Sequence, residues 1–102
     1  MKSIIQERKK CLITGTTTGL EEHHLYGGSN RKLSEKYGLK VWLTHDVHLS
    51  VTDNCGTIDV YHGGAYQSIL IGDLLHIIGQ IAFEDKHGSR EDFRQLFGKN
   101  YL

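Results

Sequence analysis

The chain reads Glu22-His23-His24-Leu25-Tyr26-Gly27-Gly28 across the segment around which we expect its functional site to form. Residues 20–25 are predicted to form a short strand that carries two adjacent histidines. Because successive side chains on a strand point to opposite faces, one imidazole can bind a metal ion while its neighbour takes a different role. The glycine pair lets the backbone turn sharply and approach a ligand closely. The basic residues Arg31 and Lys32 follow this turn and could hold a phosphate group.

The composition is that of a globular protein. The 102 residues suit a single domain, 1–102, with 38% apolar and 24% charged residues. Lysine plus arginine and aspartate plus glutamate both number 12, so the formal net charge is zero. This balance argues against strong non-specific DNA binding, although a local basic patch stays open. The seven histidines are the outlying feature of the composition.

The ends and the cysteines bear on location. Residues 1–10 are charged and contain no apolar core segment, so we expect no secretory signal. No run of apolar residues is long enough to span a membrane, so no membrane partner is expected. Cys11 and Cys55 have no framework spacing, which favours free thiols in a cytoplasmic location. A single disulfide between these two cysteines remains an alternative.

The first half of the chain alternates between short strands and turns. We expect helical character over residues 4–10, a strand over 11–15 that forms a hairpin with 20–25, a helix over 31–37, and strands over 39–44 and 57–62. Gly38 is expected to end the 31–37 helix. In the 39–44 strand, Val41 and Leu43 share one face.

The second half is predicted to be helical. Apolar residues recur at three- and four-residue spacing over 65–86, which predicts one long helix. Gly72 and Gly79 each cost about 1 kcal/mol relative to alanine in a helix interior, so we expect close packing there. Ser89 and the residues after it resemble a capping box that begins a final helix over 91–97. The expected fold is α+β, with a small β-hairpin and strand region packed on the long helix and the short final helix.

Histidines are concentrated in the non-helical half. A neutral imidazole is the commonest metal ligand among side chains and a general base near neutral pH. The candidates are His23, His24, His45, His48 and His62. His45 and His48 would share a face on a helical turn, although a surface role for His45 is also open. His76 and His87 lie in the helical half, and we expect them to be structural or surface residues.

Four segments together resemble a known family: residues 22–32, residues 37–44, His48 and residues 62–64. They are similar to the small phage-encoded HNH-type endonucleases, which have the ββα-metal fold. The resemblance is close over residues 11–48 and looser in the C-terminal region, where residues 97–102 are similar to the tail of that group.

The resemblance implies a metal-dependent endonuclease that hydrolyses DNA phosphodiester bonds. It implies that His23 and His48 bind a divalent ion such as Mg²⁺ or Mn²⁺, with His62 completing the site. His24 would be the general base that acts on water. Arg31 and Lys32 would bind phosphate, or would form only a solvated basic turn. A phage protein of this kind would act in the host cytoplasm.

The sequence departs from the family pattern in three ways. Members often carry two cysteine pairs that bind a structural zinc ion, but here Cys11 is followed by Thr14 and Thr44 at the other positions. One thiol and two hydroxyls do not supply tetrahedral zinc ligation, so we expect no structural zinc. The asparagine that the family carries before the 40–43 strand is absent. Residues 49–61 resemble an insertion.

Two other interpretations stay open. Zero net charge and the departures above are also typical of a catalytically inactive HNH-fold binding protein with a host protein as partner. A phage inhibitor of a host defence nuclease, such as an anti-CRISPR protein, is one version. A homo-oligomer through helix 65–86 is a further alternative, because Ile71, Leu75 and Phe83 extend its apolar surface beyond one stripe.

Overall fold

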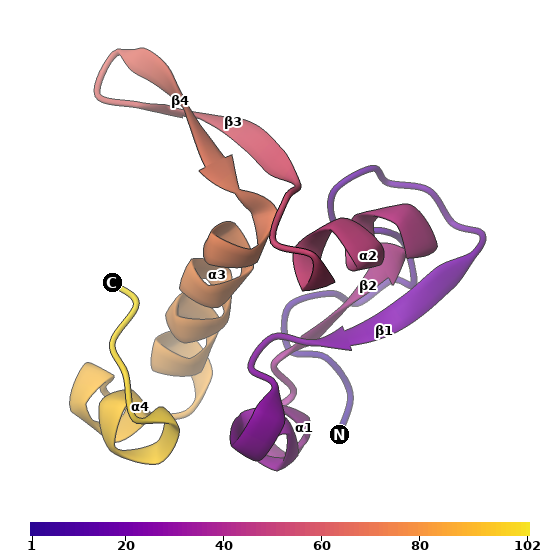
Figure 1. Cartoon of the computed structure of the whole chain (residues 1–102). Helices are drawn as coiled ribbons and strands as arrows, with labels where there is room; N and C mark the ends of the chain where they lie inside the picture. Colours follow the sequence, from indigo (N-terminus) through magenta and orange to yellow (C-terminus); the bar gives the residue numbers. More distant parts are fainter.

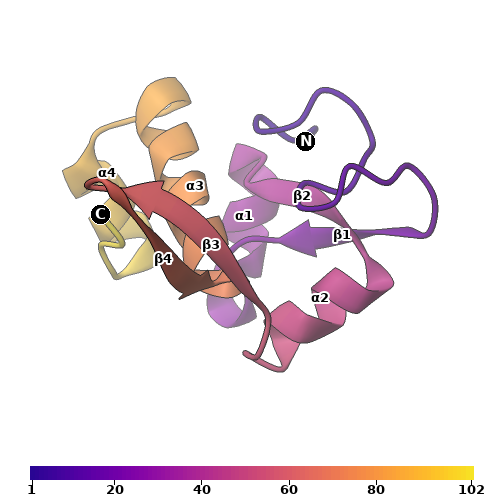
Figure 2. The same ribbon diagram turned by 90° about the horizontal axis from the view of Figure 1, so that it is seen from above.

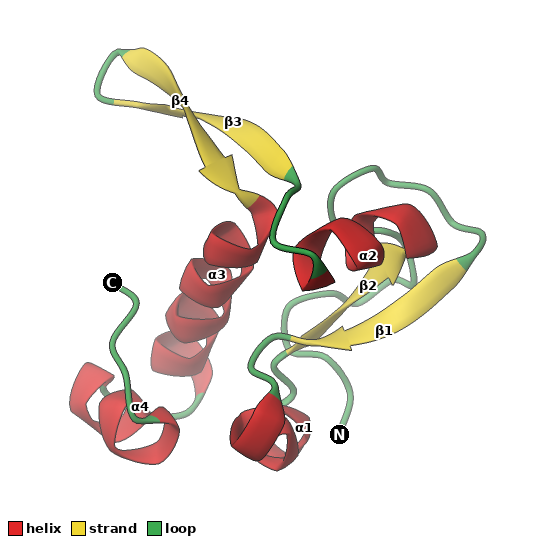
Figure 3. Ribbon diagram, viewed as in Figure 1, coloured by secondary structure: helices red, strands yellow, loops and turns green.

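The computed structural model describes all residues from 1 to 102 as an α+β fold with two small antiparallel sheets and four α-helices (Figures 1 and 3). The elements in chain order are β1 (Leu20–His24), the 3₁₀ turn η1 (Gly28–Asn30), α1 (Arg31–Tyr37), β2 (Lys40–Thr44), α2 (His45–Thr52), β3 (Thr57–His62), β4 (Ala65–Leu70), α3 (Ile71–Lys86) and α4 (Arg90–Phe97). Both views place β1, β2 and α2 together, beside the pair α3 and α4 (Figures 1 and 2).

The first sheet pairs β1 with β2, and His23 lies opposite Val41. The expected strand at residues 11–15 was wrong. Those residues form a turn in which the Gly15 N–H donates to the Cys11 carbonyl, and Gly15 has a φ of +77° that favours glycine. β1 therefore pairs with a strand that is distant in the chain. Val41 and Leu43 are almost completely buried, as their alternation predicts, and this burial favours the long-range pairing.

The N-terminal segment contains no helix, so the expectation of helical character over residues 4–10 was also wrong. The segment lies along β2 and bonds to its backbone. Ser3 Oγ donates to the Lys40 carbonyl at 2.6 Å, and Gln6 Oε1 accepts from the Trp42 N–H at 2.8 Å. These bonds satisfy backbone groups of an otherwise open strand edge, which a local helix would leave unpaired.

Helix α2 follows β2 without a linker. Thr44 has an extended backbone conformation, and its hydroxyl accepts the Val47 N–H, so it caps the helix. The cap turns the chain so that α2 contacts both β1 and β2 (Figure 1). His45 and His48 therefore lie one turn apart at the start of α2.

Helix α1 ends, as predicted, at Gly38 with a φ of +70°.

The long helix predicted over residues 65–86 is shorter than expected. Residues 65–70 form β4, which pairs with β3 in a hairpin, and only Ile71–Lys86 are helical. Gly63 and Gly64 both have positive φ values and allow the two-residue turn between the strands. Cross-strand pairing with β3 outweighs the helical spacing of the apolar residues. The hairpin projects from the rest of the molecule (Figure 1).

The core lies between β2, α3 and α4. Its buried apolar residues are Cys11, Leu25, Tyr26, Leu39, Val41, Leu43, Ile71, Leu75, Phe83, Phe93 and Phe97. The expectation of close packing is confirmed at Gly79, where a Cβ would lie 2.6 Å from Tyr26 Oη, and was wrong at Gly72, where a Cβ would meet only Val51 Cγ1 at 3.7 Å. Ile71, Leu75 and Phe83 are covered within one chain, so their burial requires no second subunit.

The last helix is correctly predicted. The Ser89 hydroxyl and the Asp92 carboxylate form the expected capping box at the start of α4.

Cys11 is buried, Cys55 is exposed, and both thiols are free. None of the helices combines the length and the apolar character that a membrane span needs.

Candidate metal-binding and catalytic site

The two faces of β1 carry different chemistry. Because strand side chains alternate, Glu21 and His23 project from one face, and Glu22 and His24 project from the other. Helix α2 covers the first face, where it contacts both Glu21 and His23. The adjacent histidines therefore have different surroundings, as the sequence predicts for two neighbours on a strand.

His23 and His48 are brought together from β1 and α2. Their ring centroids lie 5.0 Å apart with an interplanar angle of 67°. Burial, together with the nearby His48, lowers the pKa of His23 to about 4. His23 is therefore neutral at pH 7 and retains a lone pair on one ring nitrogen. A neutral imidazole is the form that binds metal ions.

Glu21 connects strand β1 to both histidines of α2. Its Oε1 lies 2.8 Å from His48 Nδ1, and its Oε2 lies 2.9 Å from His45 Nδ1. These bonds lower the pKa of Glu21, and the bond to Glu21 raises the pKa of His45. An ionised carboxylate only accepts hydrogen bonds, so each Nδ1 donates and His48 is left with Nε2 free. Metal-binding histidines are commonly held by a carboxylate in this way.

A pocket of about 230 Å³ adjoins the His23 ring. His23 and His24 line it together with oxygen-bearing side chains from the end of α2 and the start of α3. Those side chains are Thr52, Asn54 and Asp73. Imidazole nitrogen with hydroxyl, amide and carboxylate oxygen is a donor set that suits a divalent ion such as Mn²⁺ or Zn²⁺. The donor types suit the cation that the resemblance implies, but His48 does not line this pocket, and no three His, Cys, Asp or Glu ligand atoms on this side lie within 4.8 Å of one another.

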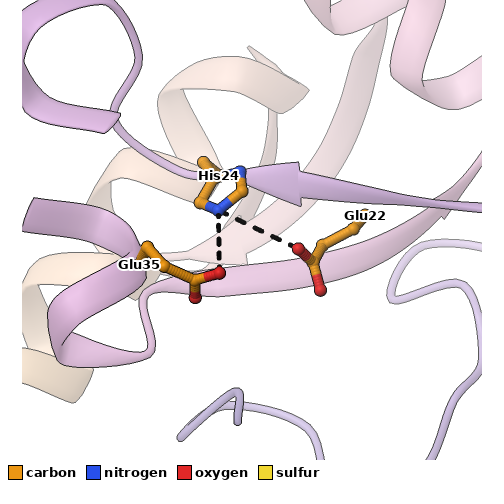
Figure 4. Close-up of side chains that lie close together, drawn as sticks. All are labelled: Glu22, His24 and Glu35. Atoms are coloured by element: carbon orange, nitrogen blue, oxygen red, sulfur yellow. Dashed lines mark ion pairs between the residues drawn. The ribbon is translucent and has the colours of Figure 1, made fainter. Parts of the chain in front are cut away.

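The opposite face of β1 holds a second cluster. His24 Nε2 lies 3.8 Å from Glu35 Oε1 and 3.9 Å from Glu22 Oε1 (Figure 4). These ligand-type atoms all lie within 4.8 Å of one another, close enough to share a metal ion. However, Lys40 Nζ already lies 2.6 Å from Glu35 Oε2 and 3.4 Å from Glu22 Oε2. The ammonium group supplies the positive charge that the two carboxylates need.

The pKa values in this second cluster follow from the same contacts. The hydrogen bond from Lys40 lowers the pKa of Glu35. Burial by itself would lower the pKa of Lys40, but the bond to Glu35 and the charge of Glu22 raise it overall. Glu35 and Lys40 are therefore both charged at neutral pH. We regard the His23–His48 side as the better cation site, since no lysine occupies it.

The structure does not bring His62 into either group. His62 is the last residue of β3, pairs with Ala65 and is exposed. It lies next to the tight turn of the hairpin, which projects away from β1 and α2 (Figure 1). Arg31 and Lys32 lie in the first turn of α1, are exposed and form no ion pair. Both remain available to bind an anion.

Threonines pack around Cys11 at the positions where the family carries its other cysteines. The Thr14 N–H donates to Cys11 Sγ at 3.5 Å. Burial acts to raise the pKa of Cys11, but hydrogen bonds from Thr14 and Thr44 bring it down to about 7. The three positions that the resemblance assigns to zinc ligation thus meet in space, and they offer one sulfur atom between them.

Sequence reasoning missed several residues of this region. Glu21 could have been found, because it lies two positions before His23 and hence on the same strand face. Thr52, Asn54 and Asp73 carried no signal, since only the packing of α2 against α3 brings them to His23. His76 also lines the pocket, but it stacks on Tyr26 with centroids 5.2 Å apart.

No family model matches the chain, and neither the curated proteins nor the solved structures contain a match to it.

Proposed function

We propose that this protein is a metal-dependent, HNH-like endonuclease that hydrolyses DNA phosphodiester bonds. The single observation that carries the proposal is the meeting of His23 with His48, whose Nδ1 is held by Glu21. A neutral imidazole, His23, that lines a pocket with oxygen donors and contacts a second, carboxylate-held histidine is typical of a catalytic divalent-metal site.

The order of elements supports the same proposal. The antiparallel strands β1 and β2 pair with each other although η1 and α1 lie between them in the chain, and α2 follows β2 at once and packs on both. Apart from the inserted α1, two paired strands and a helix are what the resemblance implies for the ββα-metal region. The candidate ligands lie on the first strand and on the helix, and His24 lies next to the first of them.

Each residue then has a defined role. His23 and His48 would hold the cation, with Thr52, Asn54 or Asp73 contributing oxygen. When bound, the divalent ion supplies Lewis-acid stabilisation of the charge that develops on the phosphate. His24 lines the same pocket and would accept a proton from the attacking water. Arg31 and Lys32 would hold a flanking phosphate, and His62 has no part in the ligand set.

The test is cleavage of supercoiled plasmid and linear DNA with Mg²⁺, Mn²⁺ or Ni²⁺, before and after chelation by EDTA. We expect nicking or linearisation that is lost in His24→Ala and His48→Ala. His62→Ala is the matched control and should retain activity, because this histidine lies in the projecting hairpin. Absence of cleavage with every metal, or cleavage that survives loss of His24, would refute the nuclease.

A second candidate function is favoured by the β3–β4 hairpin. Its strands contain one charged residue, Asp59, and at its far half Tyr61 and Tyr66 are 65% and 74% exposed. The two tyrosines are cross-strand partners with ring centroids 5.1 Å apart. Exposed aromatic residues without surrounding charge are typical of protein interfaces rather than phosphate contacts.

This second candidate is a catalytically inactive binding protein that recognises a host protein, for example a defence nuclease. Its test is a binding assay against purified host nucleases in EDTA. We expect a stoichiometric complex that Tyr61→Ala weakens, while His48→Ala does not. A complex that needs metal, or one that tolerates both Tyr61→Ala and Tyr66→Ala, would contradict this function.

A further inference from the structure

The surroundings of His24 raise a question that the proposed function leaves open. A histidine that accepts a proton must present one defined nitrogen to the attacking water, and the other nitrogen must be held. Glu21 holds His48 in this way, but Glu21 lies on the opposite face of β1 from His24. The family asparagine expected before β2 is absent from this sequence. Another group must therefore hold the His24 ring.

Two carboxylates face one edge of that ring. Glu35 from α1 and Glu22 from β1 approach His24 Nε2 at 3.8 and 3.9 Å, so they lie on the same side of the imidazole (Figure 4). Neither glutamate lines the pocket of about 230 Å³, whereas His24 does. The Nε2 edge of the ring is therefore turned toward the carboxylates. Nδ1 has no hydrogen-bond partner in the protein, and we infer that it is the ring nitrogen available to the pocket.

Lys40 fixes the two carboxylates. It is only 9% exposed and lies across from His24 in the β1–β2 register. Its ammonium group contacts Glu35 Oε2 at 2.6 Å and Glu22 Oε2 at 3.4 Å, and both of these are the oxygens that do not face His24. Each carboxylate thus spans from the lysine to the imidazole. The ammonium group is almost completely buried whereas the two carboxylates are partly exposed, and the contacts with it restrict the rotation of both glutamate side chains.

We propose that Glu22 and Glu35, held by Lys40, are positioning residues that keep the proton on His24 Nε2 and present Nδ1 to the attacking water. This inference rests on the proposed nuclease function, because it gives His24 Nδ1 the role of proton acceptor. The two carboxylates lie 3.8 and 3.9 Å from Nε2, too far for a direct hydrogen bond, but their negative charge attracts an N–H and repels a lone pair, so it favours the Nε2–H tautomer.

The first measurement is independent of catalysis. The ¹⁵N chemical shifts of the imidazole nitrogens distinguish the two neutral tautomers, and the His24→Gln variant identifies the His24 signals among the seven histidines. In the intact protein in EDTA we expect His24 to show the Nε2–H pattern. In Glu22→Gln/Glu35→Gln the pattern should move toward a tautomer mixture, because an amide can donate to Nε2 as well as accept from it.

The second measurement is the rate of DNA cleavage. The same double variant should lower kcat by about tenfold, less than the 10²- to 10⁴-fold that the general base itself contributes, and leave KM nearly unchanged. Glu91→Gln is the matched control, because Glu91 is exposed on α4 and pairs with Arg94. Circular dichroism and thermal unfolding compare the folding of the two variants. Lys40→Met, which frees both carboxylates to rotate, should reproduce the kcat loss in part.

The outcomes separate the inference from the function on which it rests. An Nδ1–H pattern in the intact protein, or a tautomer that the double variant does not alter, overturns the positioning role even if DNA is cleaved. An Nε2–H pattern that shifts as expected, in a protein that cleaves DNA through His24, supports it. The same shift in a protein that cleaves nothing with any metal refutes the catalytic use of the arrangement, together with the nuclease function.

Discussion

The imidazole of His23, near the end of β1, meets the imidazole of His48, in the first half of α2, edge to face at a centroid distance of 5.0 Å. Glu21 joins the same two elements through its bond to His48 Nδ1. The contact brings together two residues that belong to different secondary structure and makes the pair a candidate for metal binding. Four predictions follow from this arrangement and from the packing that supports it.

Mn²⁺ or Ni²⁺ should stabilise the folded protein through the His23–His48 pair. A ligand that binds only the native state at 100 times its Kd adds about 2.7 kcal/mol to the free energy of unfolding. We expect the melting temperature to rise with metal concentration in the unaltered chain and to stay constant in His23→Ala/His48→Ala. His62→Ala should respond like the unaltered chain. Equal metal responses in all three proteins would place the cation elsewhere.

Glu21→Gln should weaken metal binding without abolishing it. The substitution keeps the shape of the side chain but removes the charge that holds His48 Nδ1 at 2.8 Å. Loss of such an outer partner typically costs 10- to 100-fold in metal affinity. Isothermal titration with Mn²⁺ measures the change. Glu7→Gln, an exposed glutamate in the N-terminal segment, serves as the control and should bind as tightly as the unaltered chain.

The stability of the metal-free protein should fall as the pH drops from about 6.5 to about 4. Burial holds the pKa of His23 at about 4, below its ordinary value of 6.5. In this window the unfolded chain binds a proton that the folded chain does not, so protons favour unfolding. We expect a contribution on the order of 2 kcal/mol, because His23 keeps part of its surface in water. Urea unfolding of the unaltered chain and His23→Gln in EDTA measures it.

The comparison between these two proteins isolates His23 from the other titrating groups. His23→Gln should show a shallower dependence of unfolding free energy on pH between 4 and 6.5. Parallel curves for the two proteins would show that the pKa of His23 in the folded state is close to its ordinary value. The lowered pKa of His23 would then be wrong.

Two glycines of α3 should respond in opposite directions to substitution by alanine. At Gly79 a Cβ would lie 2.6 Å from Tyr26 Oη and 2.9 Å from Leu25 Cδ1, so Gly79→Ala should destabilise the fold by about 1–3 kcal/mol. At Gly72 a Cβ would meet only Val51 Cγ1 at 3.7 Å, so Gly72→Ala should stabilise it by about 0.5–1 kcal/mol. Chemical denaturation of both variants checks the pair. A gain in stability at Gly79 would mean that α3 does not pack closely on Tyr26.

The local elements were predictable where short-range physics decides them. Gly38 ends α1 in the left-handed conformation, Ser89 and Asp92 form the capping box of α4, and Val41 and Leu43 share the buried face of β2. Each of these depends on backbone conformation or on side-chain alternation over a few residues. The apolar spacing at 65–70 also fits a helix, but pairing with β3 turned those residues into a strand.

The sequence by itself determined that adjacent histidines on a strand take different surroundings, because strand side chains alternate. Only the tertiary structure decided which partners each histidine has. β1 pairs with β2 instead of residues 11–15, and α2 folds back over β1, so His23 meets His48 and His24 meets Glu22 and Glu35. The same packing leaves His62 at the end of a projecting hairpin. Burial of Val41 and Leu43 selects this strand pairing, and such long-range burial is invisible to any local pattern.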